Sequence, residues 1–315
     1  MKSITFTCEV VTPMFLAGAD GSTPELREPS IKGALRFWWR ALHGCLPIDD
    51  IENPNCAVQK GLRTQEAEIF GRGGDKARRS CLIIKTTHPE WDKNFRTELL
   101  PHKKQGSTKA FNPKTPQSFQ VNLSLTRLFE DFDINRLEAL FVLTFALGGF
   151  GKRSRRGFGS VRIVKKNDVM FQMPCDLSAI LEYVLKFNRD YRYDSQNDRI
   201  LLLKPDLLNG KYQKVYPYIE EIRIGNDYNS GFELVERIGE TSHAYQTNLN
   251  GCPSPRFASP TYVSTLKDKT DKTQYYPVIT SLCLALPPGI NDSEDGRNNM
   301  NDFRNAILDK RLPLY

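Results

Sequence analysis

The sequence has no apolar run long enough to cross a bilayer. Its longest such run, residues 139–147, contains Thr144 and falls well short of the roughly 20 residues that a membrane-spanning helix needs. Residues 3–11 alternate polar and apolar side chains as a strand does, and no continuous apolar signal-peptide segment follows Lys2. We therefore expect a protein that is neither embedded in a membrane nor exported.

Paired cysteines and clustered histidines are scarce. The seven cysteines form an odd set without a C-x-x-C pair, and there are only four histidines. The nearest approach to a zinc pattern is His43 with Cys45, followed by Cys56 eleven residues later. This spacing favours buried, reduced thiols over zinc ligands or disulfides, and it indicates a cytoplasmic protein without a metal.

Common cofactor-binding motifs are absent even from the most glycine-rich segment, residues 148–160 (GGFGKRSRRGFGS). The segment is not a P-loop, because Lys152 is followed by Arg153 instead of Ser or Thr. It does not fit G-x-G-x-x-G either, because the frame that starts at Gly149 ends at Ser154. We therefore expect no cofactor.

Positive charge, in contrast, is abundant. The 315 residues include 44 Lys and Arg against 37 Asp and Glu, which gives a net charge of +7. This balance favours an anionic partner without identifying it. Hydrophobic residues make up 39% of the chain, which is usual for a globular protein, and the length suits about two domains of roughly 100–200 residues each.

The first half predicts the element order β-α-β-β-α-β. Strands are predicted over residues 3–11, 80–86, 119–125 and 160–164, and helices over residues 30–42 and 134–147. This order is typical of a ferredoxin-like (RRM-like) domain, here with long insertions at residues 45–79 and 88–117.

The second half predicts a helix followed by β-α-β-β-α. Helices are predicted over residues 177–187, 232–240 and 301–308, and strands over residues 218–224, 258–266 and 277–286. No closing strand follows the last helix, so that strand could come from earlier in the chain. We predict an α+β protein with two ferredoxin-like domains, residues 1–170 and 171–315, of which the second is irregular.

The first predicted helix has an apolar stripe and a basic face, and Ser30 is its expected N-cap. The apolar stripe consists of Ile31, Leu35, Trp38 and Leu42. The basic face consists of Lys32, Arg36, Arg40 and His43. Phe37 and Trp39 flank the stripe, where they are either candidate surfaces for base stacking or flanking core residues.

The glycine-rich segment adds a second group of cations. Its basic positions are Lys152, Arg153, Arg155 and Arg156, and the glycines that would let a ligand approach closely are Gly151, Gly157 and Gly159. In a β-α-β-β-α-β fold, this segment and the first helix can lie near one sheet edge and form a single groove for unpaired nucleic acid. The alternative is a solvated basic hairpin.

Two long stretches resemble a known family. Residues 12–20 (TPMFLAGAD) and 24–40 (PELREPSIKGALRFWWR) are similar to the opening of the first-subunit family of type III-B CRISPR (Cmr) effector complexes, which belongs to the RAMP superfamily. The glycine-rich loop of that superfamily resembles residues 148–160. Residues 68–71 (EIFG) and 256–260 (RFASP) also look like RAMP positions, so the resemblance reaches both halves.

The resemblance implies two ferredoxin-like domains in an RNA-binding subunit that lies near the 3′ end of the guide RNA. Such a subunit contacts guide or single-stranded target RNA and neighbouring Cmr subunits, and cleavage belongs to the repeated backbone subunit, so we do not expect an enzyme. The predicted RNA-binding residues are Arg27, Lys32, Arg36, Arg40, Gly151, Lys152, Arg153, Arg155, Arg156, Gly157 and Gly159.

A RAMP-superfamily endoribonuclease is the alternative function. Asp20 follows the first strand, where the backbone subunit of such complexes carries its cleaving aspartate, but it has no evident carboxylate partner, and an Asx turn that structures the loop is the alternative. His43 is a candidate general acid or base, although a helix C-terminus also favours a cationic histidine for structural reasons. A third possibility is a structural cap that contacts only protein.

The segment from residue 102 to residue 114 contains Lys103, Lys104, Lys109 and Lys114 among turn-forming residues. It is predicted as a mobile basic loop that either contacts RNA or is simply solvated.

Overall fold

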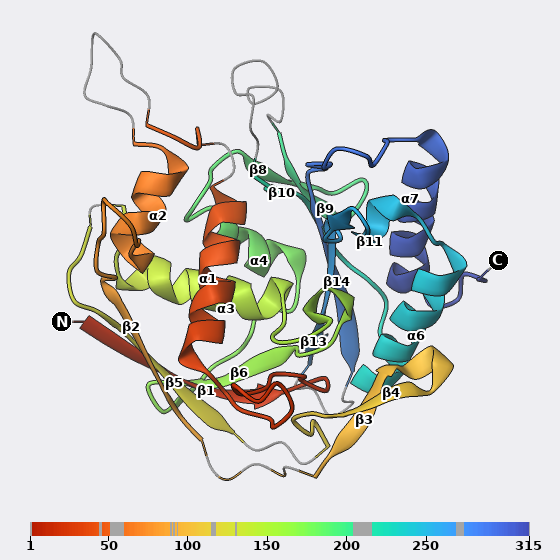
Figure 1. Cartoon of the computed structure of the whole chain (residues 1–315), viewed down its shortest axis with the longest axis horizontal. Coiled ribbons are helices and arrows are strands. Elements are labelled where there is room, and N and C mark those ends of the chain that lie inside the picture. The colour runs from red at the N-terminus through yellow and green to blue at the C-terminus, as the bar shows by residue number, and fades with distance from the viewer. Residues whose placement is uncertain are drawn as a thin grey trace.

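The computed structural model describes residues 2–314 apart from 44–45, 51–59, 89, 91, 93, 115–117, 130, 204–215 and 269–273. The chain forms a mixed α+β structure with antiparallel sheets (Figure 1). Among the described residues, every helix is too short or too polar to span a membrane.

The first sheet has the strand order β2-β5-β1-β6-β7. Its strands are β1 (Lys2–Val10), β2 (Leu82–Thr87), β5 (Phe119–Leu125), β6 (Val161–Lys166) and β7 (Val169–Met170). The central strand β1 buries every second side chain, from Ile4 to Val10, and pairs with β5 and β6. The four predicted strands of this half are confirmed within about two residues at each end.

Helices α1 (Glu28–Leu42) and α3 (Ile134–Leu147) lie on the same side of this sheet (Figure 1). The predicted bounds of α3 are confirmed, and Asp133 caps it by accepting hydrogen bonds from the backbone N–H groups of Asn135 and Arg136. The predicted N-cap of α1, Ser30, is wrong. The helix begins two residues earlier because Pro29 fits its first turn, and Ser30 donates its N–H to the carbonyl of Arg27.

The two insertions of the first half are partly regular. The first contains α2 (Leu62–Phe70), and the second contains a hairpin of β3 (Arg96–Leu100) and β4 (Gln105–Lys109), joined by the 3-10 turn η1 (Pro101–Lys103). The prediction of a mobile loop over residues 102–114 is therefore wrong for most of its length. The hairpin packs against α6 (Gly231–Ala244), where a Cβ atom on Gly239 would collide with the His102 ring.

The second sheet has the order β13-β14-β10-β9-β8. Its strands are β8 (Tyr191–Asp194), β9 (Arg199–Leu202), β10 (Ile219–Ile224), β13 (Thr261–Lys267) and β14 (Tyr275–Leu282). The residues described after the last helix, 309–314, form no strand. The place beside β10, opposite β14, is instead taken by β9, which comes earlier in the chain.

Helices pack on both faces of the second sheet. Tyr262 on β13 belongs to the core that includes α3 and α4 (Leu177–Val184), whereas its neighbour Val263 packs with α6 and α7 (Glu294–Leu308). A single apolar cluster runs from the first sheet through α3 and α4 into the second sheet. The division of the chain near residue 170 stays a prediction, and the two halves share this core.

Candidate nucleic-acid interface

The glycine-rich segment, residues 148–160, packs closely against backbone atoms of the same chain. Gly151 and Gly159 have φ values of +84° and +69°. A Cβ atom at these positions would collide with the backbone of Phe15 and of Phe150, respectively. These two glycines therefore have a structural reason to be present, whether or not a ligand approaches them.

Arg156 lies where the first and second halves of the chain contact each other. Its Nη2 donates to the carbonyl of Asn250 at 2.6 Å, and its Nη1 donates to Ser259 Oγ at 3.0 Å and to the carbonyl of Thr261 at 3.3 Å. Burial, with repulsion from Arg153 and Arg155, lowers the pKa of this guanidinium to about 10, so it stays charged at neutral pH. Arg156 ties the glycine-rich segment to the second half.

The other three cations of the segment differ in exposure. Lys152 is exposed, whereas Arg153 is half-buried with its guanidinium 5.9 Å from the centre of the Phe158 ring, and burial lowers its pKa. The half-buried Arg155 lies 4.6 Å over the ring of Tyr262 and donates to the carbonyl of Ser259. Lys152 is therefore the member most open to a phosphate.

On α1, a buried carboxylate holds two of the predicted RNA-binding arginines. Glu66 Oε1 lies 2.6 Å from Arg36 Nη2 and 2.6 Å from Arg40 Nη1. Glu66 comes from α2, inside an insertion for which the sequence predicted no element, and lies 26 and 30 residues away along the chain. Sequence reasoning missed this partner because no local spacing connects it to α1.

The remaining predicted positions on α1 have no ion-pair partner among the residues that the structure describes. Lys32 is half-buried, and burial together with the neighbouring Arg36 lowers its pKa. Arg27 is half-buried at the start of the helix, where its carbonyl accepts the first hydrogen bonds.

The first helix and the glycine-rich segment meet at a set of arginines and aromatic rings, which we call the arginine–aromatic cluster. Its members are Phe37, Arg40, Arg155, Tyr216 and Tyr262. The Arg40 guanidinium lies 4.7 Å from the ring of Tyr216, and the Phe37 and Tyr262 rings are 5.2 Å apart. Arg155 contacts both of those rings. Phe37 and Tyr216 are half-buried and partly open to a ligand.

Trp39 does not share this surface. Only 2% of it is exposed, because its ring stacks 4.2 Å from the His43 ring and packs against Phe70. Its prediction as a base-stacking surface is therefore wrong, whereas the alternative of a flanking core residue is confirmed.

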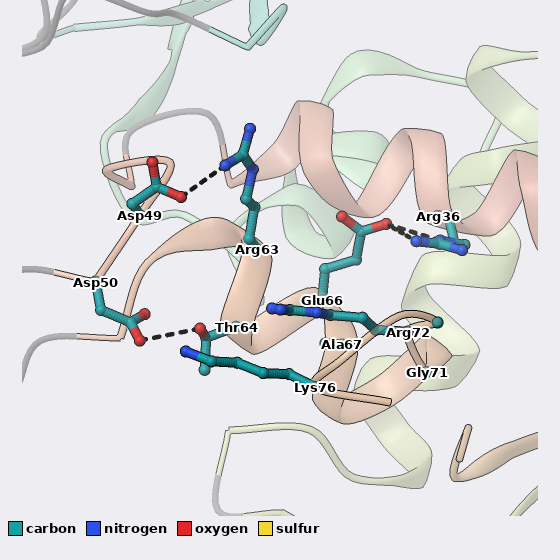
Figure 2. Close-up of a pocket in the computed structure, with 11 residues that line it drawn as sticks. Arg36, Asp49, Asp50, Arg63, Thr64, Glu66, Ala67, Gly71, Arg72 and Lys76 are labelled. Atoms are coloured by element: carbon teal, nitrogen blue, oxygen red, sulfur yellow. Dashed lines mark hydrogen bonds and ion pairs between the residues drawn. The ribbon is translucent and has the colours of Figure 1, made fainter. Parts of the chain in front are cut away.

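A pocket of about 550 Å³ opens between α1 and α2 (Figure 2). Its lining residues include the cations Arg36, Arg63, Arg72 and Lys76 and the acids Asp49, Asp50 and Glu66. Asp49 binds Arg63 at 2.8 Å, and Asp50 accepts from the Thr64 hydroxyl at 3.1 Å. In Figure 2 the Lys76 side chain extends toward Thr64. Charges of both signs are therefore interspersed here.

The geometry at Asp20 is that of an Asx turn. Its carboxylate accepts hydrogen bonds from the backbone N–H groups of Ser22 and Thr23 and from both hydroxyl groups. These bonds, above all that from the Thr23 hydroxyl, hold the pKa of Asp20 well below its usual range. In the described part of the chain, no group of three or more His, Cys, Asp or Glu side chains is arranged to hold a metal ion. The zinc alternative at Cys45 and Cys56 lies outside the described residues.

His43 is poorly suited to proton transfer. The half-buried ring lies against Trp39, and its Nδ1 is 2.7 Å from the Trp39 carbonyl. Burial lowers the pKa of this imidazole to about 4, so it is neutral at pH 7. The expectation of a cationic histidine at the helix end is wrong, because the cost of burying the charge exceeds its attraction to the helix C-terminus.

Comparisons with known proteins agree on one family. A model of the RAMP superfamily matches residues 7–162. The CRISPR system Cmr subunit Cmr1-2 of Pyrococcus furiosus is 30% identical over 182 residues, which cover 52% of this chain and 96% of that protein. Cmr subunit Cmr1-1 of the same organism is 28% identical over 247 residues, which cover 72% of this chain and 66% of that protein.

Solved structures share the fold. The crystal structure of apo Cmr1 from Pyrococcus furiosus matches with a TM-score of 0.58 and 19% identity, covering 99% of this chain and 98% of that one. A chain of the type III-B Cmr-beta complex bound to cognate target RNA matches with a TM-score of 0.59 and 10% identity, covering 97% of this chain and 99% of that one. The chain therefore belongs to the RAMP superfamily, and within it to the Cmr1 family of CRISPR Cmr subunits.

Proposed function

We propose that this chain is an RNA-binding, non-catalytic subunit of a type III-B CRISPR effector complex. It assembles in the cytoplasm with other Cmr subunits and contacts guide or single-stranded target RNA near the 3′ end of the guide. The fold of the Cmr-beta chain, solved in a complex bound to target RNA, supports this proposal. We further propose that each half is a ferredoxin-like domain, with β9 as the closing strand of the second.

The arginine–aromatic cluster is the observation that carries the proposal. Unpaired RNA is bound by combining cations along the phosphate backbone with flat surfaces on which bases stack. Phe37 and Tyr216 offer half-buried rings, and each lies beside a guanidinium. The cluster joins α1 to the glycine-rich segment, the two stretches that resemble RAMP motifs.

The predicted RNA-binding residues then have different tasks. Lys32 and Lys152 bind phosphates, with Arg27 as a weaker contact, because no acidic side chain among the described residues pairs with them. Arg36 and Arg40 bind phosphates once Glu66 releases them. The other members shape and support the interface: Gly151, Arg153, Arg155, Arg156, Gly157 and Gly159.

Charge removal at the two free lysines tests the proposal. In a Lys32→Ala, Lys152→Ala double variant, we expect about tenfold weaker binding of single-stranded RNA. The dependence of log affinity on log salt should fall by about 0.7 for each lost contact. A variant of all four cations in the glycine-rich segment would be less informative, because Arg156 also holds the two halves together.

The matched control is Arg311→Ala, which removes one charge from a 78% exposed side chain beyond the end of α7. Its RNA affinity should equal that of the parent. Unchanged affinity and salt dependence in the double variant would remove α1 and the glycine-rich segment from the interface.

A further inference from the structure

A loop that follows α2 forms one wall of the pocket in Figure 2. Two backbone hydrogen bonds between Arg72 and Arg78, of 2.9 and 2.8 Å, close this loop. Gly71, which precedes it, has a φ of +80°, and a Cβ atom there would collide with the backbone of Arg78 and Ser80. The backbone therefore fixes the position of residues 72–78, which we call the 72–78 loop.

Two cations of the 72–78 loop line the pocket without an acidic partner. Arg72 and Lys76 are exposed, and neither forms an ion pair with a residue that the structure describes. In Figure 2 both side chains extend in the same direction from the loop. On α1, Arg36 shares Glu66 with Arg40, so that two guanidiniums meet one carboxylate. The positive charge at the pocket therefore exceeds the negative charge that pairs with it.

The three acids of the pocket are already bound within the chain. Glu66 and Asp49 form ion pairs with arginines. Asp50 accepts hydrogen bonds from the backbone N–H of the α2 N-cap residue at 2.7 Å and from the Thr64 hydroxyl at 3.1 Å. These bonds hold the pKa of Asp50 below its usual range, with smaller contributions from two nearby lysines. The acids therefore have partners of their own and leave the two loop cations for a ligand.

Arg36 connects the pocket to the basic face of α1. Its side chain lines the pocket, and it lies one helical turn after Lys32. Burial and the neighbouring charge of Arg36 together lower the pKa of Lys32, which shows that the two cations are close. An anionic strand that contacts Lys32 is therefore next to the mouth of the pocket.

We propose that the pocket between α1 and α2 binds a backbone phosphate of single-stranded RNA, held between Arg36 and the 72–78 loop. This inference rests on the proposed function and extends its interface to the α2 side of α1. Arginine and lysine nitrogens donate charge-assisted hydrogen bonds to phosphate oxygens. The pocket volume of about 550 Å³ leaves room for a phosphate with its sugar.

Arg72→Ala in the full chain tests the pocket, with fluorescence anisotropy of labelled single-stranded RNA as the measurement. We expect about fivefold weaker binding and a salt dependence of log affinity that is smaller by about 0.7, as for one lost phosphate contact. Arg72→Lys should restore most of the salt dependence, because it keeps the charge. Both side chains are exposed, so the melting temperature of the free protein should stay that of the parent.

The matched control is Arg79→Ala. Arg79 is an exposed arginine just beyond the same loop that does not line the pocket. Its removal takes away the same charge and should change RNA affinity less than twofold. Equal losses in Arg72→Ala and Arg79→Ala would mean that net charge alone acts, and would overturn the proposal.

Lysine acetylation mapped by mass spectrometry supplies a readout in the parent protein. Saturating RNA should slow the acetylation of Lys76 at least fivefold and leave that of Lys165, an exposed lysine on β6, unchanged. Equal reactivity of Lys76 with and without bound RNA would contradict the proposal.

The two sets of variants separate this proposal from the proposed function. Loss of affinity in Lys32→Ala, Lys152→Ala without loss in Arg72→Ala would retain the proposed interface and refute the pocket. Loss in Arg72→Ala alone would retain the pocket and remove the glycine-rich segment from the interface. A parent chain without RNA affinity would refute both.

Discussion

The two basic regions of this chain differ in what holds their arginines. In the glycine-rich segment, Arg156 donates to neutral carbonyl and hydroxyl oxygens of the second half. On α1, Arg36 and Arg40 share one carboxylate, Glu66. A guanidinium bound by neutral groups keeps its net positive charge, whereas two guanidiniums on one carboxylate lose part of theirs. Arginines that look equivalent in the sequence therefore give unequal electrostatic potentials in the fold.

We expect Arg156→Ala to have the largest effect on stability. This substitution removes the arginine that is bound by neutral carbonyl and hydroxyl oxygens. The substitution removes the guanidinium and with it the hydrogen bonds to the Ser259 hydroxyl and to the carbonyls of Asn250 and Thr261. We expect the free energy of unfolding to fall by about 1.5–3 kcal/mol, because buried neutral acceptors lose a charged hydrogen-bond donor. Urea unfolding followed by far-UV circular dichroism measures this change.

Lys152→Ala is the control for that measurement. Lys152 is an exposed cation of the same segment, so its removal should change the free energy of unfolding by about 0.5 kcal/mol or less. Similar small losses for both variants would mean that Arg156 does not join the halves, and the comparison would fail.

The pH dependence of stability extends the comparison to the end of α1. The fold holds the pKa of His43 at about 4, whereas an unfolded histidine titrates near about 6.5. Between these values the unfolded chain binds more protons, so stability is complete above about pH 6.5 and falls as the pH drops toward 4. We expect this histidine to account for about 2 kcal/mol of the loss between pH 7 and 4.5.

The measurement is the difference between the parent and His43→Phe in urea unfolding at several pH values. The variant should lose less stability on acidification, and the contribution of His102, whose pKa burial also lowers, cancels because both proteins contain it. Parallel curves would show that the His43 ring is not buried in its neutral form.

The sequence predicted the elements whose signal is local and missed those that depend on distant partners. The bounds of α3 and the buried stripe of α1 follow from local apolar periodicity, which tertiary structure reinforces. Strands β8 and β9 were missed because each has only four residues, because β8 carries two charged side chains, and because β9 gains its place only by pairing with β10. Long-range pairing of this kind has no local signal.

The same reasoning applies to the candidate interface. Its cations and its glycine-rich segment were identifiable from residue type and spacing, and the meeting of that segment with α1 followed from the expected element order. The ion pairs of Arg36 and Arg40 with Glu66 could not be predicted, because Glu66 reaches these arginines only through the packing of α2 on α1. A sequence therefore indicates the sign of a charge more readily than its partner.

Glu66→Gln tests the other region, in which Arg36 and Arg40 share one carboxylate. Its expected effect, on RNA affinity, is smaller. Freeing Arg36 and Arg40 should raise the affinity for single-stranded RNA about tenfold at moderate salt, and steepen the salt dependence by about 0.7 per new phosphate contact. Fluorescence anisotropy with labelled RNA at several salt concentrations measures both quantities.

The matched control is Glu68→Gln on the same helix, which removes the same charge from a carboxylate that binds Lys60 and Arg78. It should raise RNA affinity less than Glu66→Gln does. Equal gains would mean that net charge alone, and not the release of two arginines on α1, controls binding.

Asp20→Ala should have the smallest effect on RNA. The carboxylate of Asp20 already accepts bonds from Ser22 and Thr23, and among the described residues it belongs to no group of three or more His, Cys, Asp or Glu side chains that could hold a metal. Incubation of labelled single-stranded RNA with the parent and the variant, with Mg²⁺ or with EDTA, should give identical products and equal affinity. Cleavage that depends on Mg²⁺ and disappears in Asp20→Ala would instead favour the ribonuclease alternative. In that case the Asx turn would position a nucleolytic carboxylate, and the basic regions compared above would hold a substrate instead of a guide.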